Sequence, residues 1–164
     1  MTQYLPAAIG DVAWVFFFVL LVCAVLCDLC WMRIPNWLTA MTALLFPLAA
    51  LATPAPVAWM SHLAAGGLVF GACVLLFLFG WMGGGDVKLL GGVALWVGLA
   101  RLPDYVVLVI LLGGMLTTAL VLVRWLVGRM VVNPCGLPLV LRSKGVPYGV
   151  AISGGAFLMF FLPQ

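Results

Sequence analysis

The sequence predicts an all-α fold, a polytopic membrane protein with six transmembrane helices in one membrane-embedded domain, residues 1–164. Hydrophobic residues make up 67% of the chain and charged residues only 7%, and the mean hydropathy is +1.34. Since a soluble domain carries about 25% charged residues, this chain has too few charges to cover a water-exposed surface. The net charge of +3 is small and dispersed, and it gives no indication of nucleic-acid binding.

Six apolar segments approach the roughly 20 residues that a transmembrane helix needs. The first follows Asp11 as an unbroken apolar run, the second contains Pro47, which predicts a kink, and the third contains Gly67-x-x-x-Gly71, a spacing that predicts close helix contact. The fourth is short, the fifth follows Pro103, and the sixth starts at Pro147, a residue favoured at helix starts. The expected spans are residues 12–31, 37–53, 61–81, 87–100, 104–127 and 147–162.

The cations predict how the chain is oriented, because cytoplasmic loops of membrane proteins carry an excess of Lys and Arg. If the chain crosses the membrane six times, Arg101 is the only cation in the segments on one side. The other side receives Arg33, Lys88, Arg124, Arg129, Arg142 and Lys144. We therefore expect a protein of the cytoplasmic (inner) membrane, surrounded by the lipid bilayer, with both termini outside and the odd-numbered loops in the cytoplasm.

The acidic residues are four aspartates, and the chain has no glutamate. Asp11, Asp86 and Asp104 each stand just before an apolar run, where an aspartate caps the free N–H groups of a helix start. For Asp11 and Asp104, which fall on the outer side, we expect this structural role alone. Asp28 has no such explanation, because it lies deep in the first apolar run. An ionisable residue inside a span is costly and is by default a functional candidate.

Asp28 and Asp86 are predicted to lie at similar depth near the cytoplasmic side, on different helices. Asp86 follows Gly83-Gly84-Gly85, and consecutive glycines allow another backbone to approach closely. Two neighbouring carboxyl groups share a proton, so that one acts as base and the other as acid toward a water molecule. This arrangement can hydrolyse peptide bonds. The structural alternative for Asp28 is pairing with Arg33 or a hydrogen bond to a neighbouring helix.

Three motifs, in order along nearly the whole chain, carry a resemblance to a known family. The segment Gly83-x-Gly85-Asp86 resembles the GxGD signature of intramembrane aspartyl proteases, and Asp28 is followed by Arg33-Ile34-Pro35-Asn36, similar to the stretch after that family's first aspartate. The element Lys144-Gly145-Val146-Pro147-Tyr148-Gly149 matches near the last span. Together they resemble the type IV prepilin peptidases, in particular the short CpaA/TadV-like branch.

The resemblance implies an aspartic endopeptidase that removes the basic leader from type IV or Flp prepilins at the cytoplasmic face. It implies that Asp28 and Asp86 are the catalytic pair, and that the pilus assembly machinery is a possible partner besides the prepilin. Lys88 either favours the charged form of Asp86 or marks the membrane interface. The residues implied to bind substrate or shape the site are Gly83, Gly85, Lys88, Arg33, Pro35, Asn36, Pro147, Tyr148 and Gly149.

We predict no metal and no organic cofactor. Cys27-x-x-Cys30 has no second Cys or His pair nearby to complete a tetrahedral site, and the first loop is too short for the zinc-binding segment of longer prepilin peptidases, which makes methyltransferase activity doubtful. Two other functions stay open. A small proton-coupled transporter would use the two acids as ion sites, and a non-catalytic subunit of a secretion or pilus assembly system would tolerate their replacement.

Overall fold

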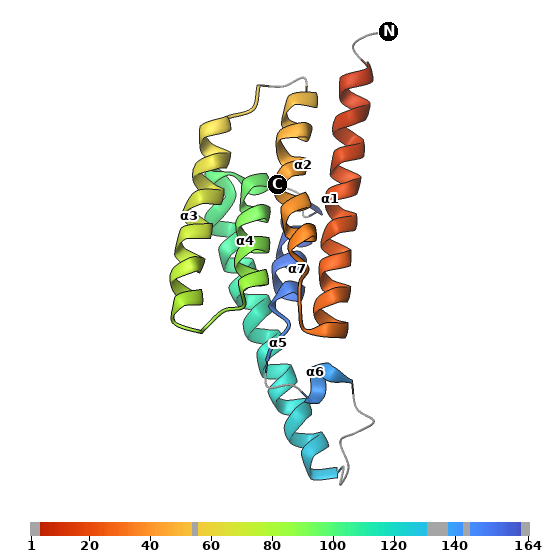
Figure 1. The fold of residues 1–164 in the computed structure, drawn as a ribbon, viewed down its shortest axis with the longest axis vertical. Helices are drawn as coiled ribbons and strands as arrows, with labels where there is room; N and C mark the ends of the chain where they lie inside the picture. Colours follow the sequence, from red (N-terminus) through yellow and green to blue (C-terminus); the bar gives the residue numbers. More distant parts are fainter. Residues whose placement is uncertain (1–3, 54–55, 131–137, 143–144, 162–164) are drawn as a thin grey trace.

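A computed structural model describes residues 4–53, 56–130, 138–142 and 145–161. The described chain is all α-helical, with no strand in these ranges (Figure 1). Lys144 and Cys135 lie outside the described residues. The elements are α1 (Tyr4–Trp31), α2 (Asn36–Ala52), α3 (Trp59–Leu78), α4 (Gly84–Val97), a 3₁₀ turn η1 (Leu99–Arg101), α5 (Leu102–Met130), the short α6 (Leu139–Arg142) and α7 (Tyr148–Phe161).

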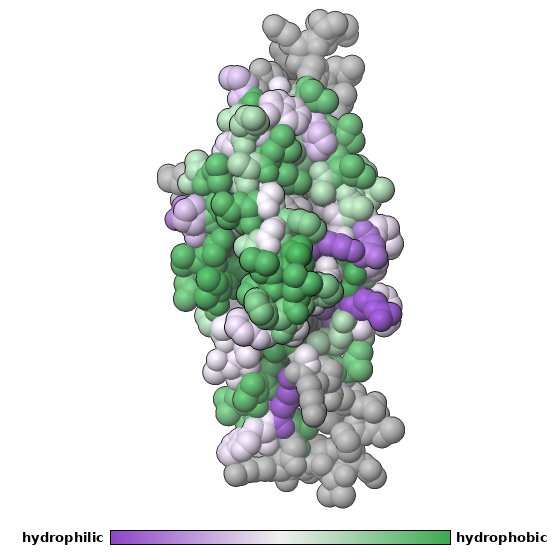
Figure 2. All heavy atoms as spheres, turned by 60° about the vertical axis from the view of Figure 1, so that its left-hand side comes forward, coloured by the Kyte–Doolittle hydropathy of each residue, from purple (hydrophilic) through white to green (hydrophobic). Residues whose placement is uncertain are grey.

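The all-α membrane fold predicted from the sequence is confirmed. Each of the six expected spans forms a helix, and α6 is an additional short one. Three segments are long and apolar enough to cross a membrane, namely Asp11–Trp31, Trp59–Leu78 and Leu99–Val127, while Asn36–Ala52 and Tyr148–Phe161 are shorter apolar helices. Hydrophobic side chains cover most of the visible face of the bundle (Figure 2), as expected for a surface in contact with lipid.

The ends of the helices are set by a few backbone positions. After α1 the chain turns at Met32, which has a φ of 52° and whose N–H donates to the carbonyl of Asp28. A left-handed residue at this position ends a helix. The third span ends at Leu78, earlier than predicted, and Gly80 follows with a φ of 73°. Gly98, with a φ of 74°, separates α4 from η1.

Two expectations from the sequence are wrong. Asp11 does not cap a helix start, because α1 begins at Tyr4 and Asp11 lies exposed inside the helix. Gly67 and Gly71 do not provide a close helix contact, since among the described residues nothing lies within 4 Å of where a Cβ of either would be. Their neighbour Gly66 does so instead, with the side chain of Leu95 at 2.5 Å from its Cβ position.

Helices α4 and α7 lie in the middle of the bundle (Figure 1). Helix α4 packs against α3, α2 and α7, while α1 packs against α2 and α7, and α5 against α7. A cluster of aromatic rings fills the interior. Trp96 of α4 stacks on Phe17 with ring centroids 4.3 Å apart, and its indole N–H donates to the carbonyl of Thr42 at 2.9 Å. One side chain therefore joins α4 to both α1 and α2.

This central position predicts a large effect of replacing Trp96, which is 4% exposed. Trp96→Ala should lower the free energy of unfolding by about 3–5 kcal/mol, because it leaves a cavity and removes a buried hydrogen bond. The measurement is unfolding of the purified protein in detergent. Trp81→Ala is the matched control, since Trp81 is 75% exposed, and an equal loss in both variants would contradict the assignment of Trp96 to the core.

Candidate active site

Asp28 lies in the last turn of α1 and is buried, with an exposed fraction of 5%. Its Oδ2 atom accepts a hydrogen bond from the backbone N–H of Gly149, at 2.7 Å. Gly149 is the second residue of α7, where backbone N–H groups have no partner inside the helix. The carboxyl group thus satisfies a free donor at the positive end of a neighbouring helix. Of the two structural alternatives for Asp28, the hydrogen bond to another helix is the one observed.

A glycine is required where α7 meets Asp28. A Cβ on Gly149 would lie 2.8 Å from Oδ2 of Asp28 and 2.9 Å from Cδ1 of Ile34. Both distances are shorter than real Cβ contacts, so any side chain here would displace the carboxyl group of Asp28 and the end of the Ile34 side chain. Pro147 is buried at the start of this turn, and its carbonyl accepts from the N–H of Val150. The Pro147-Tyr148-Gly149 element therefore presents an amide directly to Asp28.

Arg124 of α5 holds the chain just before this turn. Its Nη2 donates to the carbonyls of Val140 and Gly145, each at 2.6 Å, and its Nε donates to Val140 at 3.2 Å. A guanidinium group suits this role because it presents several donors in a fixed plane. Arg124 therefore links α5 to α6 and to the segment that leads into α7.

Asp86 is the third residue of α4 and lies in its first turn. Its carboxyl group lies against Gly83, the residue that precedes the helix. An acid at the third position of a helix is placed to reach back toward the N-cap residue in this way. A Cβ on Gly83 would lie 2.8 Å from Oδ2 of Asp86, and one on Gly85 would lie 3.1 Å from Cβ of Ile34. The glycines therefore allow the carboxyl group and the loop after α1 to approach.

The structure brings Asp28 and Asp86 to one cavity of about 230 Å³, at the end of the bundle where α1 ends and α4 begins. The two carboxyl groups are near enough to repel each other when both are charged. The cavity is lined by Asp28, Met32, Arg33, Ile34, Gly83, Gly84, Gly85 and Asp86. Two carboxyl groups beside a space large enough for water can share one proton and polarise a bound water molecule.

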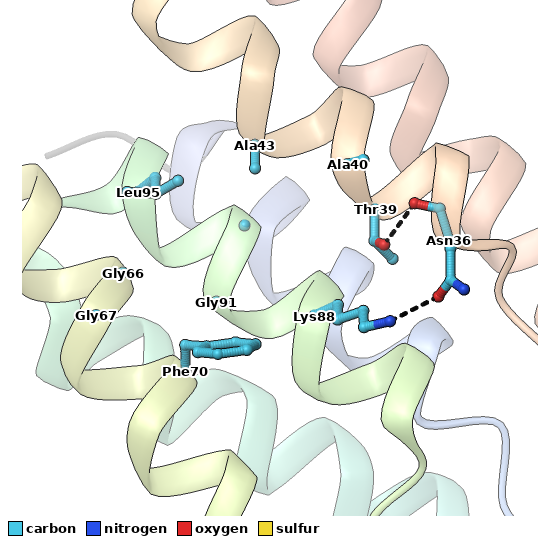
Figure 3. Close-up of a pocket in the computed structure, with 11 residues that line it drawn as sticks. Asn36, Thr39, Ala40, Ala43, Gly66, Gly67, Phe70, Lys88, Gly91 and Leu95 are labelled. Atoms are coloured by element: carbon cyan, nitrogen blue, oxygen red, sulfur yellow. Dashed lines mark hydrogen bonds between the residues drawn. The ribbon is translucent and has the colours of Figure 1, made fainter.

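Residues in and just after the loop that follows α1 line two different cavities, the aspartate cavity and a second cavity between α2, α3 and α4. Arg33 lines the cavity with the aspartates, and Pro35 is the N-cap of α2, its carbonyl accepting from the N–H of Leu38. Asn36 lines the second cavity. Its Oδ1 accepts from Nζ of Lys88 at 2.8 Å (Figure 3). Lys88 thus contacts α2, and within the described chain no ion pair joins it to Asp86.

Gly149 and Arg124 show what sequence reasoning missed. The resemblance included Gly149 without indicating that its amide contacts Asp28, and Arg124 was counted only as a cytoplasmic charge. A signal for Gly149 existed, since a glycine directly after Pro147 and Tyr148 at a helix start is a position of close approach. No local signal identifies Arg124, because its acceptors are backbone carbonyls 16 and 21 residues further along the chain.

Metal-binding side chains do not gather at this site. Within the part of the chain that the structure describes, no three His, Cys, Asp or Glu residues come together as a metal site. Cys27 is half-buried and Cys30 exposed, both on α1 beside Asp28. The site therefore consists of two carboxyl groups, backbone amides and Arg33. That no cofactor takes part stays a prediction.

Comparison with known proteins identifies a family. The model of the type IV leader peptidase family matches residues 14–122, a stretch that contains Asp28 and Asp86 and ends before Gly149. Neither the curated proteins nor the solved structures give a match to this chain.

The hydrogen bond between Gly149 and Asp28 predicts how substitutions of Asp28 affect stability. Asp28→Asn keeps an oxygen that accepts from the Gly149 N–H, whereas Asp28→Ala leaves this buried donor without a partner. We expect Asp28→Ala to unfold more easily than Asp28→Asn by about 1–3 kcal/mol, measured by denaturation in detergent. Equal stability of the two variants would contradict a structural role of this hydrogen bond.

Proposed function

The chain belongs to the type IV leader peptidase family, and from this premise we propose that it is an aspartic endopeptidase using Asp28 and Asp86. Its substrates would be type IV-class prepilins, including those of Flp pili, and it would remove the basic leader that precedes their apolar segment. The observation that carries the proposal is the shared cavity of the two carboxyl groups. Membership of the short CpaA/TadV-like branch is part of the proposal.

In the proposed reaction, one water molecule is held between the two carboxyl groups. One carboxylate takes a proton from this water as it attacks the carbonyl carbon of the scissile peptide, and the other, protonated carboxyl group donates a hydrogen bond to the carbonyl oxygen. Transfer of a proton to the leaving nitrogen then releases the leader. The pair carries one proton at the start and one at the end, so the site is regenerated.

The backbone amides would fix the pair in position. Gly149 at the start of α7 donates to Asp28, and Gly83 just before α4 lies against Asp86, so each carboxyl group is positioned by the start of a different helix. Such fixed donors require no reorganisation during the reaction. Lys88 would act through the fold, since it joins α4 to α2 through Asn36 and does not pair with Asp86 in the described chain.

We propose that the cavity faces the cytoplasm. Arg33 and Lys88 lie at the end of the bundle that holds the aspartates, while Arg101 lies at the other end, where its Nη2 donates to the carbonyl of Met159 near the end of α7. A guanidinium at a helix C-terminus is electrostatically favourable, which gives this outer cation a structural reason. The orientation would bring the aspartates to the side where a basic leader is retained.

The mechanism predicts that each aspartate is essential. Asp28→Asn and Asp86→Asn should each lower prepilin cleavage by about 10²–10⁴-fold, the usual contribution of an acid or base, with normal insertion into the membrane. Cleavage is followed on a gel after co-expression with a type IV prepilin. Asp11→Asn and Asp104→Asn are matched controls in α1 and α5. Full processing by either Asp28→Asn or Asp86→Asn would refute the two-aspartate mechanism, and uncleaved prepilin with the unaltered chain would refute the function.

Gly149→Ala tests the orientation of Asp28 separately. Its Cβ would meet Oδ2 of Asp28 at 2.8 Å, so the carboxyl group must move, and we expect kcat to fall at least about tenfold with a small change in KM. Gly71→Ala is the control, because among the described residues nothing lies within 4 Å of its Cβ position. Unchanged kcat in Gly149→Ala would show that this contact does not position the carboxyl group.

A further inference from the structure

A long apolar groove opens between α3 and α5, with a volume of about 740 Å³. Helix α3 packs on α4 and helix α5 packs on α7, and among the described helices α3 and α5 share none of the main contacts. The groove is lined by Leu68, Val69, Ala72, Cys73, Leu76, Met82, Leu90, Leu102, Val106, Val109, Ile110, Gly113, Gly114, Thr117, Thr118 and Tyr148. It is therefore a space between two helices that the described part of the chain leaves unfilled.

Helix α5, which forms one wall of the groove, is the least buried of the three long apolar helices. Only 6% of the residues in its most apolar stretch are buried, against 28% for α1 and 22% for α3. The residues that line this wall run from Leu102 to Thr118, a distance of about 24 Å along the helix axis at 1.5 Å per residue. This length approaches the roughly 30 Å thickness of the hydrocarbon core. An occupant of the groove would thus be long and apolar, with nearly the length of a membrane span.

The groove has the surface that a helix would need. Gly114 and Ala72 allow a neighbouring backbone to approach, and such small residues drive helix association in membranes. The hydroxyl groups of Thr117 and Thr118 already donate to the carbonyls of Gly113 and Gly114. These two hydroxyl groups therefore need no partner from an occupant. A peptide at this depth must satisfy its own backbone hydrogen bonds, which it does as a helix.

Two of the residues that line the groove adjoin, in the sequence, the glycines that contact the aspartates. Met82 and Tyr148 line it, and they are the direct neighbours of Gly83, which contacts Asp86, and of Gly149, which donates to Asp28. The other large cavity, about 570 Å³ between α2, α3 and α4, differs in this respect (Figure 3). Lys88 and Asn36, which line it, are hydrogen-bonded to each other from α4 to α2. Of these two cavities in the described chain, only the α3–α5 groove is lined by a residue next to Gly83 and by a residue next to Gly149.

We propose that the groove between α3 and α5 binds the apolar segment of the leader-bearing substrate as a helix. The chain just before that helix would then leave the groove past Met82 and Tyr148 and reach the cavity of Asp28 and Asp86. This inference rests on the proposed function and adds where the substrate binds.

Filling the groove tests the proposal. Gly114 lines the groove, and among the described residues nothing lies within 4 Å of its Cβ position, so Gly114→Trp adds a large side chain at the groove without a clash at its Cβ. We expect kcat/KM for a full-length prepilin to fall at least about tenfold, mainly through KM. Gly71→Trp is the matched control, because its Cβ position on α3 is equally open among the described residues and Gly71 does not line the groove. It should cleave within about twofold of the unaltered protein.

Cross-linking provides a second, direct measurement. A photoreactive benzoyl-phenylalanine is placed at Ile110, which lines the groove and is 66% exposed, or at Leu48 of α2, which is 60% exposed and lies outside the groove. Both are made in the Asp86→Asn chain, which would retain uncleaved prepilin. We expect a covalent adduct with the prepilin from position 110 and at most one tenth as much from position 48.

The outcomes separate this proposal from the function itself. If the unaltered chain cleaves the prepilin and Asp86→Asn does not, the function stands. If Gly114→Trp then cleaves as well as the unaltered chain, or positions 48 and 110 cross-link equally, the groove is not the binding site. If Gly114→Trp and Gly71→Trp lose activity equally, the effect is not specific to the groove, and the proposal is likewise overturned. Absence of cleavage by the unaltered chain would overturn both.

Discussion

The hydrogen bond from the Gly149 amide to the Asp28 carboxyl group connects two helices that are 121 residues apart in sequence. A carboxyl group in an apolar chain is costly unless it is hydrogen-bonded, and a free helix N-terminus has the complementary need for an acceptor. The Asp28 carboxyl group and the Gly149 amide therefore satisfy each other. The geometry of the aspartate cavity depends on this pairing, because it fixes the end of α1 against the start of α7 while the loop after α1 packs against Gly85 at the start of α4.

The short connections of the bundle explain how two acids on separate helices reach one cavity. Met32 ends α1 four residues after Asp28, and Pro35 begins α2 three residues later. The loop between them is thus too short to move away from the end of α1, and Ile34 is held between Gly85 and Gly149. Glycine at both positions lets the loop fill this space. The site is consequently built from three helix ends that leave little freedom to either carboxyl group.

Much of this arrangement can be predicted from the sequence. The contacts that cannot be predicted escape prediction for physical reasons. Asp28 and Asp86 stand out because an acid in an apolar run and an acid after three glycines need explanation, and the helices follow from hydropathy. Hydropathy does not predict which side of each helix is buried, because positions that face lipid and positions that face the core are both apolar. Phe16 is 57% exposed while Phe17 is fully buried. The same ambiguity made Gly67 and Gly71 resemble a packing face. The contacts of Gly149, Arg124 and Lys88 were hidden for another reason, since their partners lie 16 to 121 residues away in the sequence.

The turn before α7 has two faces with different chemistry, and this links the aspartate cavity to the apolar groove. Tyr148 lines the groove, and its ring lies 3.3 Å from the Cβ position of Gly113 on α5. Gly149, one peptide unit further, donates to Asp28. Arg124 holds the approach to this turn through the carbonyl of Gly145. A helix bound in the groove would press on Tyr148, so its presence would act on the amide that orients Asp28. Binding and orientation of the carboxyl group would then be coupled through a single turn.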